Sequence, residues 1–156
     1  MTSPSPTPAS PPPSAGAAEP PAGGGEPCPE RLHRPWGWFE TLAAAGPADA
    51  EGARIGYLVK RLWIEPGRRI SRQRHRQRCE HWVVVAGAGL LECAEAQLAA
   101  GPGTTLEIPV GAVHRASAGP EGLLIIEVQR GERLCEDDIE RFADDYGRVI
   151  GSGDNL

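Results

Sequence analysis

Short apolar segments separated by glycine or proline run from residue 36 to residue 131, and this pattern constrains the fold more than any other feature. The segments are WGWFETLA, GYLVKRLWIE, EHWVVVAG, GLLECAE, TTLEIPV, VHRASA and LLIIEVQRG. The separators are PG at 66–67, GAG at 87–89, GPG at 101–103 and GP at 119–120. Valine, isoleucine and tryptophan between such breakers are typical of strands joined by turns. The sequence therefore predicts an all-β sandwich or barrel.

One segment near the C-terminus predicts a helix instead. In EDDIERFADDYG, residues 136–147, the side chains of Ile139, Phe142 and Tyr146 recur at helical spacing. Asp137 or Asp138 would then lie in the first turn, where the helix dipole favours a negative charge. We expect a short C-terminal helix packed on the barrel as a structural lid over one open end.

The N-terminal residues have the composition of a disordered tail. Residues 1–30 hold most of the 16 prolines and contain no Lys, Arg or aromatic residue, so they bury too little apolar surface to offset the entropy of ordering. We expect a tail at 1–30 and one domain at 31–150. The chain shows neither a secretory signal nor a membrane span, which predicts a soluble, cytoplasmic protein.

Cysteines and charge exclude several classes of protein. The 4 cysteines lack C-x-x-C spacing, so we expect free thiols rather than a zinc ribbon or a redox pair. The formal net charge of −5 argues against a nucleic-acid partner. A local run of arginines between Arg68 and Arg78 has two interpretations, a solvated face or a site for an anionic small ligand.

Four polar residues have the spacing of a metal site. Gln73 and His75 are two residues apart, so in an extended chain both point to one face. If residues 76–79 turn, the carboxylate of Glu80 returns toward the same space. His114 follows the glycine- and proline-containing run GTTLEIPVGAVH, whose turn aims it into the barrel. The sequence predicts that these four residues bind one divalent ion.

These two segments resemble the paired motifs of the cupin superfamily, a jelly-roll barrel with a metal inside. The first motif, G-x5-H-x-H-x4-E-x6-G, is matched from Gly67 to Gly87, with Gln73 in the first histidine position. The second, G-x5-P-x-G-x2-H-x3-N, is matched from Gly103 to His114, and Ala118 replaces its final asparagine. The resemblance implies a single cupin barrel.

The set Gln-x-His with Glu and a distant His resembles type II mannose-6-phosphate isomerases. RPWGWFETL, GYLVKRLWIEPG, EHWVVVAG, IPVGAVHR and IIEVQRGERLCEDDIERFADDYGR follow that family in order over residues 34–148. The same domain ends bifunctional mannose-1-phosphate guanylyltransferase/mannose-6-phosphate isomerases. This chain has no glycine-rich nucleotidyltransferase signature, so we do not expect guanylyl transfer. It departs from the family at Arg76, Gln77, Arg133 and Cys135.

The resemblance implies interconversion of mannose 6-phosphate and fructose 6-phosphate at a divalent metal ion, with zinc expected. Aldose–ketose isomerisation moves a proton between C1 and C2, and the buried-strand carboxylate Glu127 is the expected base. Lys60, also mid-strand, joins it as a catalytic cation or as its salt-bridge partner. The expected substrate-binding residues, which would hold the phosphate, are Arg78, Arg115 and Arg141.

Two rival functions remain open. The departures from the family are compatible with a noncatalytic cupin that binds a sugar phosphate or nucleotide sugar. An iron-dependent oxygenase is disfavoured by Gln73, because such irons more often take a third imidazole. The expected partners are a small-molecule sugar phosphate and a second copy of the chain; exposed sheet edges and the 4 tryptophans favour a homodimer. The tryptophans are expected in the core or an interface rather than stacked on sugar.

Overall fold

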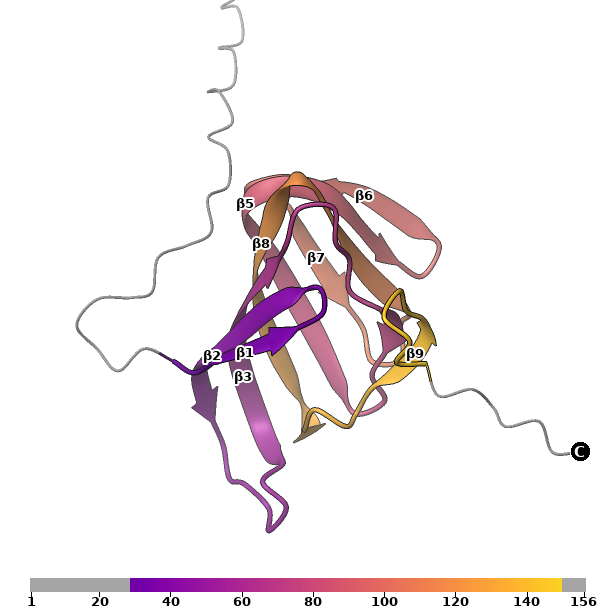
Figure 1. Cartoon of the computed structure of the whole chain (residues 1–156). Helices are drawn as coiled ribbons and strands as arrows, with labels where there is room; N and C mark the ends of the chain where they lie inside the picture. The colour runs from indigo at the N-terminus through magenta and orange to yellow at the C-terminus, as the bar shows by residue number, and fades with distance from the viewer. Residues whose placement is uncertain (1–28, 150–156) are drawn as a thin grey trace, which may run out of the picture.

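The computed structural model describes residues 29–149, which form antiparallel strands and no helix (Figure 1). The strands are β1 (Arg31–Arg34), β2 (Gly37–Ala45), β3 (Arg54–Ile64), β4 (Arg72–Arg74), β5 (Arg78–Cys93), β6 (Ala96–Ala100), β7 (Thr105–Ile108), β8 (His114–Leu134) and β9 (Glu140–Ala143). Except for Pro29 and Glu30, the predicted tail at 1–30 lies outside the described residues. No membrane-spanning helix is found in residues 29–149.

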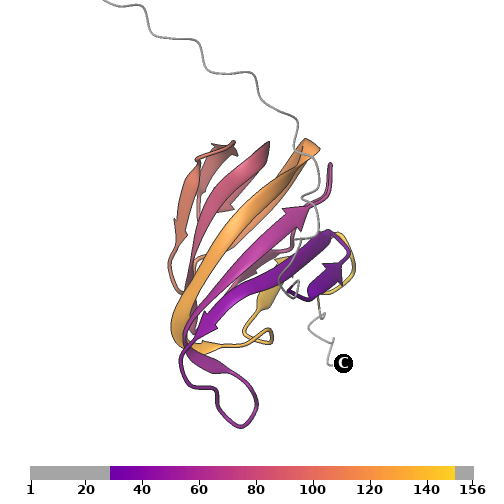
Figure 2. The ribbon, with the colours of Figure 1, turned by 90° about the vertical axis from the view of Figure 1, so that its left-hand side faces the viewer.

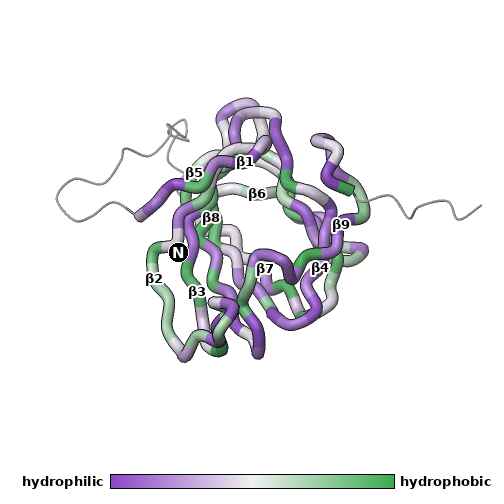
Figure 3. The backbone as a smooth tube through the Cα atoms, turned by 60° about the horizontal axis from the view of Figure 1, so that its bottom comes forward, coloured by the Kyte–Doolittle hydropathy of each residue, from purple (hydrophilic) through white to green (hydrophobic). Residues whose placement is uncertain are grey.

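All strands belong to one sheet that curls on itself. Its main order is β1-β2-β3-β8-β4-β9, and β5 pairs with β6, β7 and β8. The long strand β8 connects the parts, because it pairs with β3 and β4 as well as with β5. Figures 2 and 3 show the strands curving around a common interior. The predicted all-β jelly-roll barrel is confirmed.

Alternating side chains of the strands fill the interior. Trp82, Val84, Leu123 and Ile125 are at most 1% exposed and belong to one apolar cluster. The four tryptophans are all buried, with Trp38 and Trp63 in a second cluster on the outer side of the sheet. Burial of such side chains stabilises the fold by about 1.5–3 kcal/mol each, so the tryptophans are structural.

Two glycine-containing breaks that the sequence predicts as turns are bends within strands. EHWVVVAG and most of GLLECAE lie in the single strand β5, and most of VHRASA and all of LLIIEVQRG lie in β8. The register between β5 and β8 shifts on both sides of Ala86 and Gly87. Gly87 has φ +83°, and a Cβ there would lie 2.1 Å from the carbonyl oxygen of Gly122. Glycine therefore permits a bulge and a close backbone approach rather than a chain reversal.

The predicted C-terminal helix is wrong. Residues 136–147 contain strand β9 between two turns. β9 pairs with β4, with Arg141 opposite Gln73, and Glu140 forms ion pairs with Arg74 and Arg76. A helix of this length is marginal without tertiary support, and here the edge of β4 offers backbone hydrogen bonds and cationic partners to an extended chain. The segment from Cys135 to Arg148, called the closing segment below, runs along the side of the barrel, where its strand β9 lies next to β4 (Figure 1).

Candidate metal centre

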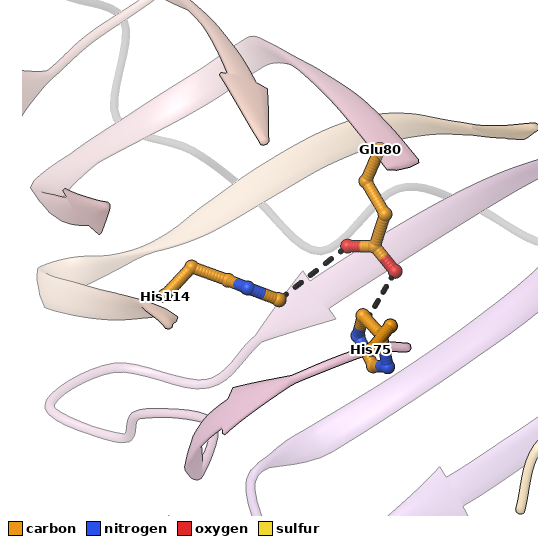
Figure 4. Close-up of side chains that lie close together, drawn as sticks. All are labelled: His75, Glu80 and His114. Atoms are coloured by element: carbon orange, nitrogen blue, oxygen red, sulfur yellow. Dashed lines mark ion pairs between the residues drawn. The ribbon is translucent and has the colours of Figure 1, made fainter. Parts of the chain in front are cut away.

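His75, Glu80 and His114 meet inside the barrel, as the sequence predicts. One ligand atom from each lies within 4.8 Å of the others, and all three side chains are buried. His75 follows β4, Glu80 lies near the start of β5, and His114 begins β8, so three separate segments of the chain contribute (Figure 4). A histidine pair and a carboxylate in this arrangement are ligands that divalent transition metals prefer.

Backbone contacts bring the two motifs together. In the pairing of β4 with β8, Gln73 lies opposite His114. The amide of Gly111 donates a hydrogen bond of 2.8 Å to the carbonyl oxygen of His75. Gly111 has φ +81°, a conformation that residues with a side chain rarely adopt. The glycine of the second motif thus shapes the turn that delivers His114 and also anchors His75.

Hydrogen bonds fix the tautomers of both histidines. Nδ1 of His75 lies 2.5 Å from the carbonyl oxygen of Asp138, and Nδ1 of His114 lies 2.9 Å from that of Ala112. A carbonyl oxygen only accepts, so Nδ1 carries the proton in each ring and Nε2 keeps its lone pair. The two Nε2 atoms face Glu80, at 3.1 Å for His75 and 3.6 Å for His114.

The site contains polar atoms that a cation would satisfy. Among the described residues, Oε2 of Glu80 and Nε2 of His114 are buried and have no hydrogen-bond partner. Lone pairs on nitrogen and carboxylate oxygen repel one another unless a cation lies between them. Burial favours the neutral form of Glu80, yet its pKa is held well below the usual range; with both imidazoles neutral, the guanidinium of Arg78 is the adjacent group that favours the carboxylate. Three of the four predicted ligands therefore fit a divalent ion.

The fourth predicted ligand, Gln73, lies beside this group. Its Oε1 accepts a hydrogen bond of 2.6 Å from the hydroxyl of Ser71, and its Nε2 lies 3.5 Å from Nε2 of His75. Ligation through oxygen requires the amide to turn by about 180°. The hydroxyl of Ser71 permits this, because it can accept as well as donate. Ligation by Gln73 stays a prediction.

A cavity of about 140 Å³ reaches this group at Glu80, which lines it, whereas His75 and His114 do not. Its polar lining residues are Arg34, Lys60, Gln73, Arg78, Glu80, Glu127, Gln129, Glu136, Arg141 and Arg148. Trp36, Phe39, Leu62, Ile70 and Ile139 supply apolar walls. Cations and acids thus surround a small space next to the metal ligands, which suits a polar ligand that carries negative charge.

Arg78 is more deeply engaged with the metal ligands than its spacing suggests. It is 6% exposed, donates from Nε to Oε1 of Glu80 at 3.0 Å, and lies 3.2 Å from Nε2 of His75 through Nη2. Its Nη1 donates to the carbonyl oxygen of Cys135 at 2.9 Å. Arg78 therefore neutralises the buried charge of Glu80; its predicted contact with substrate stays a prediction.

Glu127 lies in the same cavity with its carboxylate held on both sides. Oε2 accepts from the indole Nε1 of Trp82 at 2.9 Å, and Oε1 accepts from Nε2 of Gln129 at 2.6 Å. Burial, followed by the negative charge of Glu80, raises the pKa of Glu127 to about 7. The carboxyl group is fixed in direction and exchanges its proton more readily near neutrality than an ordinary glutamate does.

Lys60 faces the cavity but does not pair with Glu127. It lies opposite Glu127 in the register of β3 and β8, yet its ammonium forms an ion pair with Glu136 and lies 4.4 Å from the ring centroid of Phe39. The salt bridge between Lys60 and Glu127, which the sequence offers as the alternative to a catalytic role for Lys60, does not form in the structure. Lys60 is instead paired with an acid of the closing segment at the wall of the cavity.

The two remaining predicted arginines lie in different places. Arg141 lines the cavity, and its side chain makes no hydrogen bond or ion pair with the described residues; its Nε is buried. Arg115 does not line the cavity, and its Nη2 donates to the carbonyl oxygen of Ala143. Adjacent residues of a strand point to opposite faces, so His114 entering the site sends Arg115 away from it.

Sequence reasoning missed several cavity residues. Arg34 and Arg148 line the wall beside Arg141, and Gln129 and Glu136 contact Glu127 and Lys60. Arg34 and Arg148 belong to the RPWG and YGR segments that resemble the family, and this resemblance is the only sequence feature that points to a role in the site. Their spacing does not indicate that they meet, because they are more than a hundred residues apart.

The arginine run from Arg68 to Arg78 is largely paired with acids of the protein. Arg69 pairs with Asp145, and both Arg74 and Arg76 pair with Glu140. These acids belong to the closing segment. Most of the basic run therefore fastens this segment to the barrel instead of forming a free anion site.

The family departures lie outside the cavity. Arg76, Gln77, Arg133 and Cys135 all line a separate open cleft of about 440 Å³. This cleft shares only Ile139, Arg141 and Arg148 with the cavity beside the metal ligands. None of the four altered residues lines the cavity beside the predicted metal ligands.

Comparison with known proteins gives the same picture. The family model described as mannose-6-phosphate isomerase C-terminal matches residues 27–144. The chain is 39% identical over 119 residues to the alginate biosynthesis protein AlgA of Pseudomonas aeruginosa, covering 76% of this chain and 23% of that protein. It is 41% identical over 119 residues to mannose-1-phosphate guanylyltransferase of Escherichia coli, again covering 76% and 23%. The chain thus spans less than a quarter of these relatives.

A solved structure supports the fold. A cupin-2 domain from Rhodospirillum rubrum superposes with a TM-score of 0.53 at 20% identity, covering 65% of this chain and 67% of that one. At this identity the likeness concerns architecture alone. It agrees with the cupin barrel that the paired motifs predict.

Proposed function

This chain belongs to the family of mannose-6-phosphate isomerase C-terminal domains, and we propose that it is a metal-dependent isomerase that interconverts mannose 6-phosphate and fructose 6-phosphate. The observation that carries the proposal is the convergence of His75, Glu80 and His114 beside a cavity that also holds Glu127 and Arg141. Because the relatives are much longer than this chain, the proposal concerns only the reaction that this barrel can support. We expect the reaction to take place in the cytoplasm.

Gln73, His75, Glu80 and His114 would hold the ion, and zinc suits this set of nitrogen and oxygen donors. A bound divalent ion supplies Lewis acidity toward the sugar carbonyl and the adjacent oxygen. The protein prepares this function before any ion binds, because Asp138 and Ala112 fix both imidazoles with Nε2 toward Glu80. Arg78 limits the repulsion between Glu80 and other anions that enter the cavity.

Glu127 is the proposed base. Isomerisation removes the proton from C2 of the aldose and returns a proton to C1, so one carboxylate that faces both carbons can serve both steps. Trp82 and Gln129 hold the two oxygens of Glu127 in fixed directions. Trp36, Phe39 and Ile139 restrict water near the acid, which limits loss of the transferred proton to solvent. Lys60 balances negative charge at the same wall.

Arg141 is the proposed phosphate ligand, because its guanidinium has no partner among the described side chains. Arg34 and Arg148 stand beside it on the cavity wall and add positive charge. A phosphate dianion accepts hydrogen bonds from such planar donors with good geometry. This places the phosphate near the closing segment and leaves the sugar carbons to approach Glu127 and the metal ligands.

A coupled assay tests the function directly. Purified protein loaded with zinc should convert mannose 6-phosphate to fructose 6-phosphate, detected through phosphoglucose isomerase and glucose-6-phosphate dehydrogenase, and protein stripped with a chelator should not. The position of Arg76, Gln77, Arg133 and Cys135 outside the cavity supports retained turnover. Protein that binds mannose 6-phosphate in calorimetry but never converts it would instead be the noncatalytic binding module.

A further inference from the structure

Asp138 joins the closing segment to the turn that carries His75. Oδ1 of its carboxylate accepts from the backbone amide of Arg76 at 2.9 Å, and Oδ2 accepts from the amide of Gln77 at 3.1 Å. The carbonyl oxygen of the same residue lies 2.5 Å from Nδ1 of His75. Asp138 is only 8% exposed. One residue thus contacts three consecutive residues of the turn between β4 and β5.

We propose that Asp138 is a positioning residue for the metal ligand His75. The carboxylate of Asp138 holds the backbone directly after His75. The backbone carbonyl oxygen of Asp138 is thereby held against the imidazole of His75. The carbonyl then selects the tautomer in which Nε2 keeps the lone pair that a metal ion needs. The proposal rests on the proposed metal centre and adds a residue of the closing segment to it.

Alternative roles for Asp138 do not account for these contacts. The sequence predicts an acid in the first turn of a helix, and no helix exists in the described residues. A surface acid would pair with nearby arginines, but the carboxylate of Asp138 accepts from two backbone amides instead. Groups that orient the second nitrogen of a ligating histidine typically change metal affinity about 10- to 100-fold when they are altered.

The experiment compares Asp138→Ala and Asp138→Asn with a matched control, Asp137→Asn, which removes the neighbouring exposed acid. Cobalt affinity is measured by competition with a chromophoric chelator on the full chain. Asp138→Ala should weaken cobalt binding about 10- to 100-fold. Asp138→Asn, which keeps one acceptor oxygen of the correct shape, should lie between it and the wild type. Asp137→Asn should bind within about twofold of the wild type.

A second measurement needs no metal. In metal-free protein, long-range ¹H–¹⁵N spectra of the histidine rings should show His75 with the proton on Nδ1 in the wild type and in Asp137→Asn. Asp138→Ala should give a mixture of tautomers. If Asp138→Ala fails to fold, the same spectrum is recorded on Asp138→Asn, whose side chain has the same volume. A mixture of His75 tautomers in that variant supports the positioning role, and a single Nδ1-protonated ring contradicts it.

The two proposals fail in different ways. Folded Asp138 variants that bind cobalt as tightly as the wild type and keep a single Nδ1-protonated His75 would overturn the positioning role and leave the isomerase intact. Wild-type protein that binds no cobalt would overturn the metal centre, while the ring spectra would still show whether Asp138 selects the tautomer.

Discussion

The indole Nε1 of Trp82 donates a hydrogen bond of 2.9 Å to Oε2 of Glu127 across neighbouring strands β5 and β8. Trp82 is 1% exposed and part of the apolar core, so the core itself sets the direction of the proposed base. A buried carboxylate without donors would cost several kcal/mol. The contact therefore makes an ionisable group tolerable inside the barrel and aims it at the cavity.

Glu127→Gln should lower kcat about 10²- to 10⁴-fold, the contribution typical of a general base, with a much smaller change in KM. The amide keeps the shape of the side chain but cannot take up a proton. Glu132→Gln, an exposed position at the end of the same strand, is the matched control. Steady-state kinetics with zinc content measured for each variant checks the prediction, and wild-type kcat in a metal-replete Glu127→Gln enzyme contradicts it.

Arg141→Ala should mainly raise KM and reduce kcat/KM roughly tenfold to a hundredfold, which corresponds to about 1.5–3 kcal/mol for a lost charge-assisted hydrogen bond. Arg115→Ala should change kcat/KM little, because Arg115 does not line the cavity. Steady-state kinetics of both variants distinguishes the roles of the two arginines, which the sequence could not do. Arg78→Ala is a less specific test, since this side chain also contacts Glu80 and His75. Equal effects of Arg141→Ala and Arg115→Ala would remove the phosphate assignment.

The protein should bind about one divalent transition metal per chain. Elemental analysis after dialysis should find the ion in the wild type, and the His75→Ala/His114→Ala double variant should lose it. An ion at a hundred times its Kd should stabilise the fold by about 2.7 kcal/mol, so chelation should lower Tm. His81→Ala, which alters a partly exposed histidine on the other face of β5, should neither lose the ion nor change the effect of chelation on Tm. A full equivalent of metal in the double variant would locate the site elsewhere.

Asp144 should contribute stability that depends on pH. Its carboxylate accepts from the side chain and backbone of Arg148, and these hydrogen bonds outweigh partial burial and hold its pKa below the ordinary value of 3.8. A carboxyl with a lower pKa in the folded state stabilises the fold above its unfolded pKa, and this stability disappears as the pH falls through the folded pKa.

Urea denaturation of the wild type and Asp144→Asn between roughly pH 2 and pH 7 checks this sign. The difference in free energy of unfolding should be largest above roughly pH 5 and shrink toward the acid end, where both side chains are uncharged. A difference that stays constant over this range would mean that Asp144 acts through shape alone.

We predict a homodimer in solution. The tryptophans cannot supply its contact surface, because all four are buried within the protomer. Val83 and Val85 on the outer face of β5 are 40% and 48% exposed and offer apolar surface instead. Light scattering at tens of micromolar should give about twice the chain mass of 16.6 kDa. The double variant Val83→Asp/Val85→Asp should have a mass closer to that of the monomer. A monomer mass for the wild type would reject the prediction.

Much of the barrel and two of the candidate metal ligands could be predicted from the sequence because their signals are local. Strand segments show in the alternation of residues over a few positions, and His75 and Glu80 lie within one short stretch. The breaks GAG at 87–89 and GP at 119–120, which the sequence predicts as turns, lie within β5 and β8, since glycine permits a bulge as readily as a turn. Distinguishing the two requires the partner strand, which sequence pattern alone does not supply.

The sequence by itself determined the all-β class, and it predicted that His75, Glu80 and His114 lie close enough to bind one ion. Only the tertiary structure decided that residues 140–143 are a strand, that Asp138 contacts His75, and that Arg141 faces the cavity while Arg115 does not. Each of these depends on contacts between residues tens of positions apart. Helical spacing in the closing segment competes with backbone pairing and ion pairs offered by β4, and those partners exist only once the chain has folded around them.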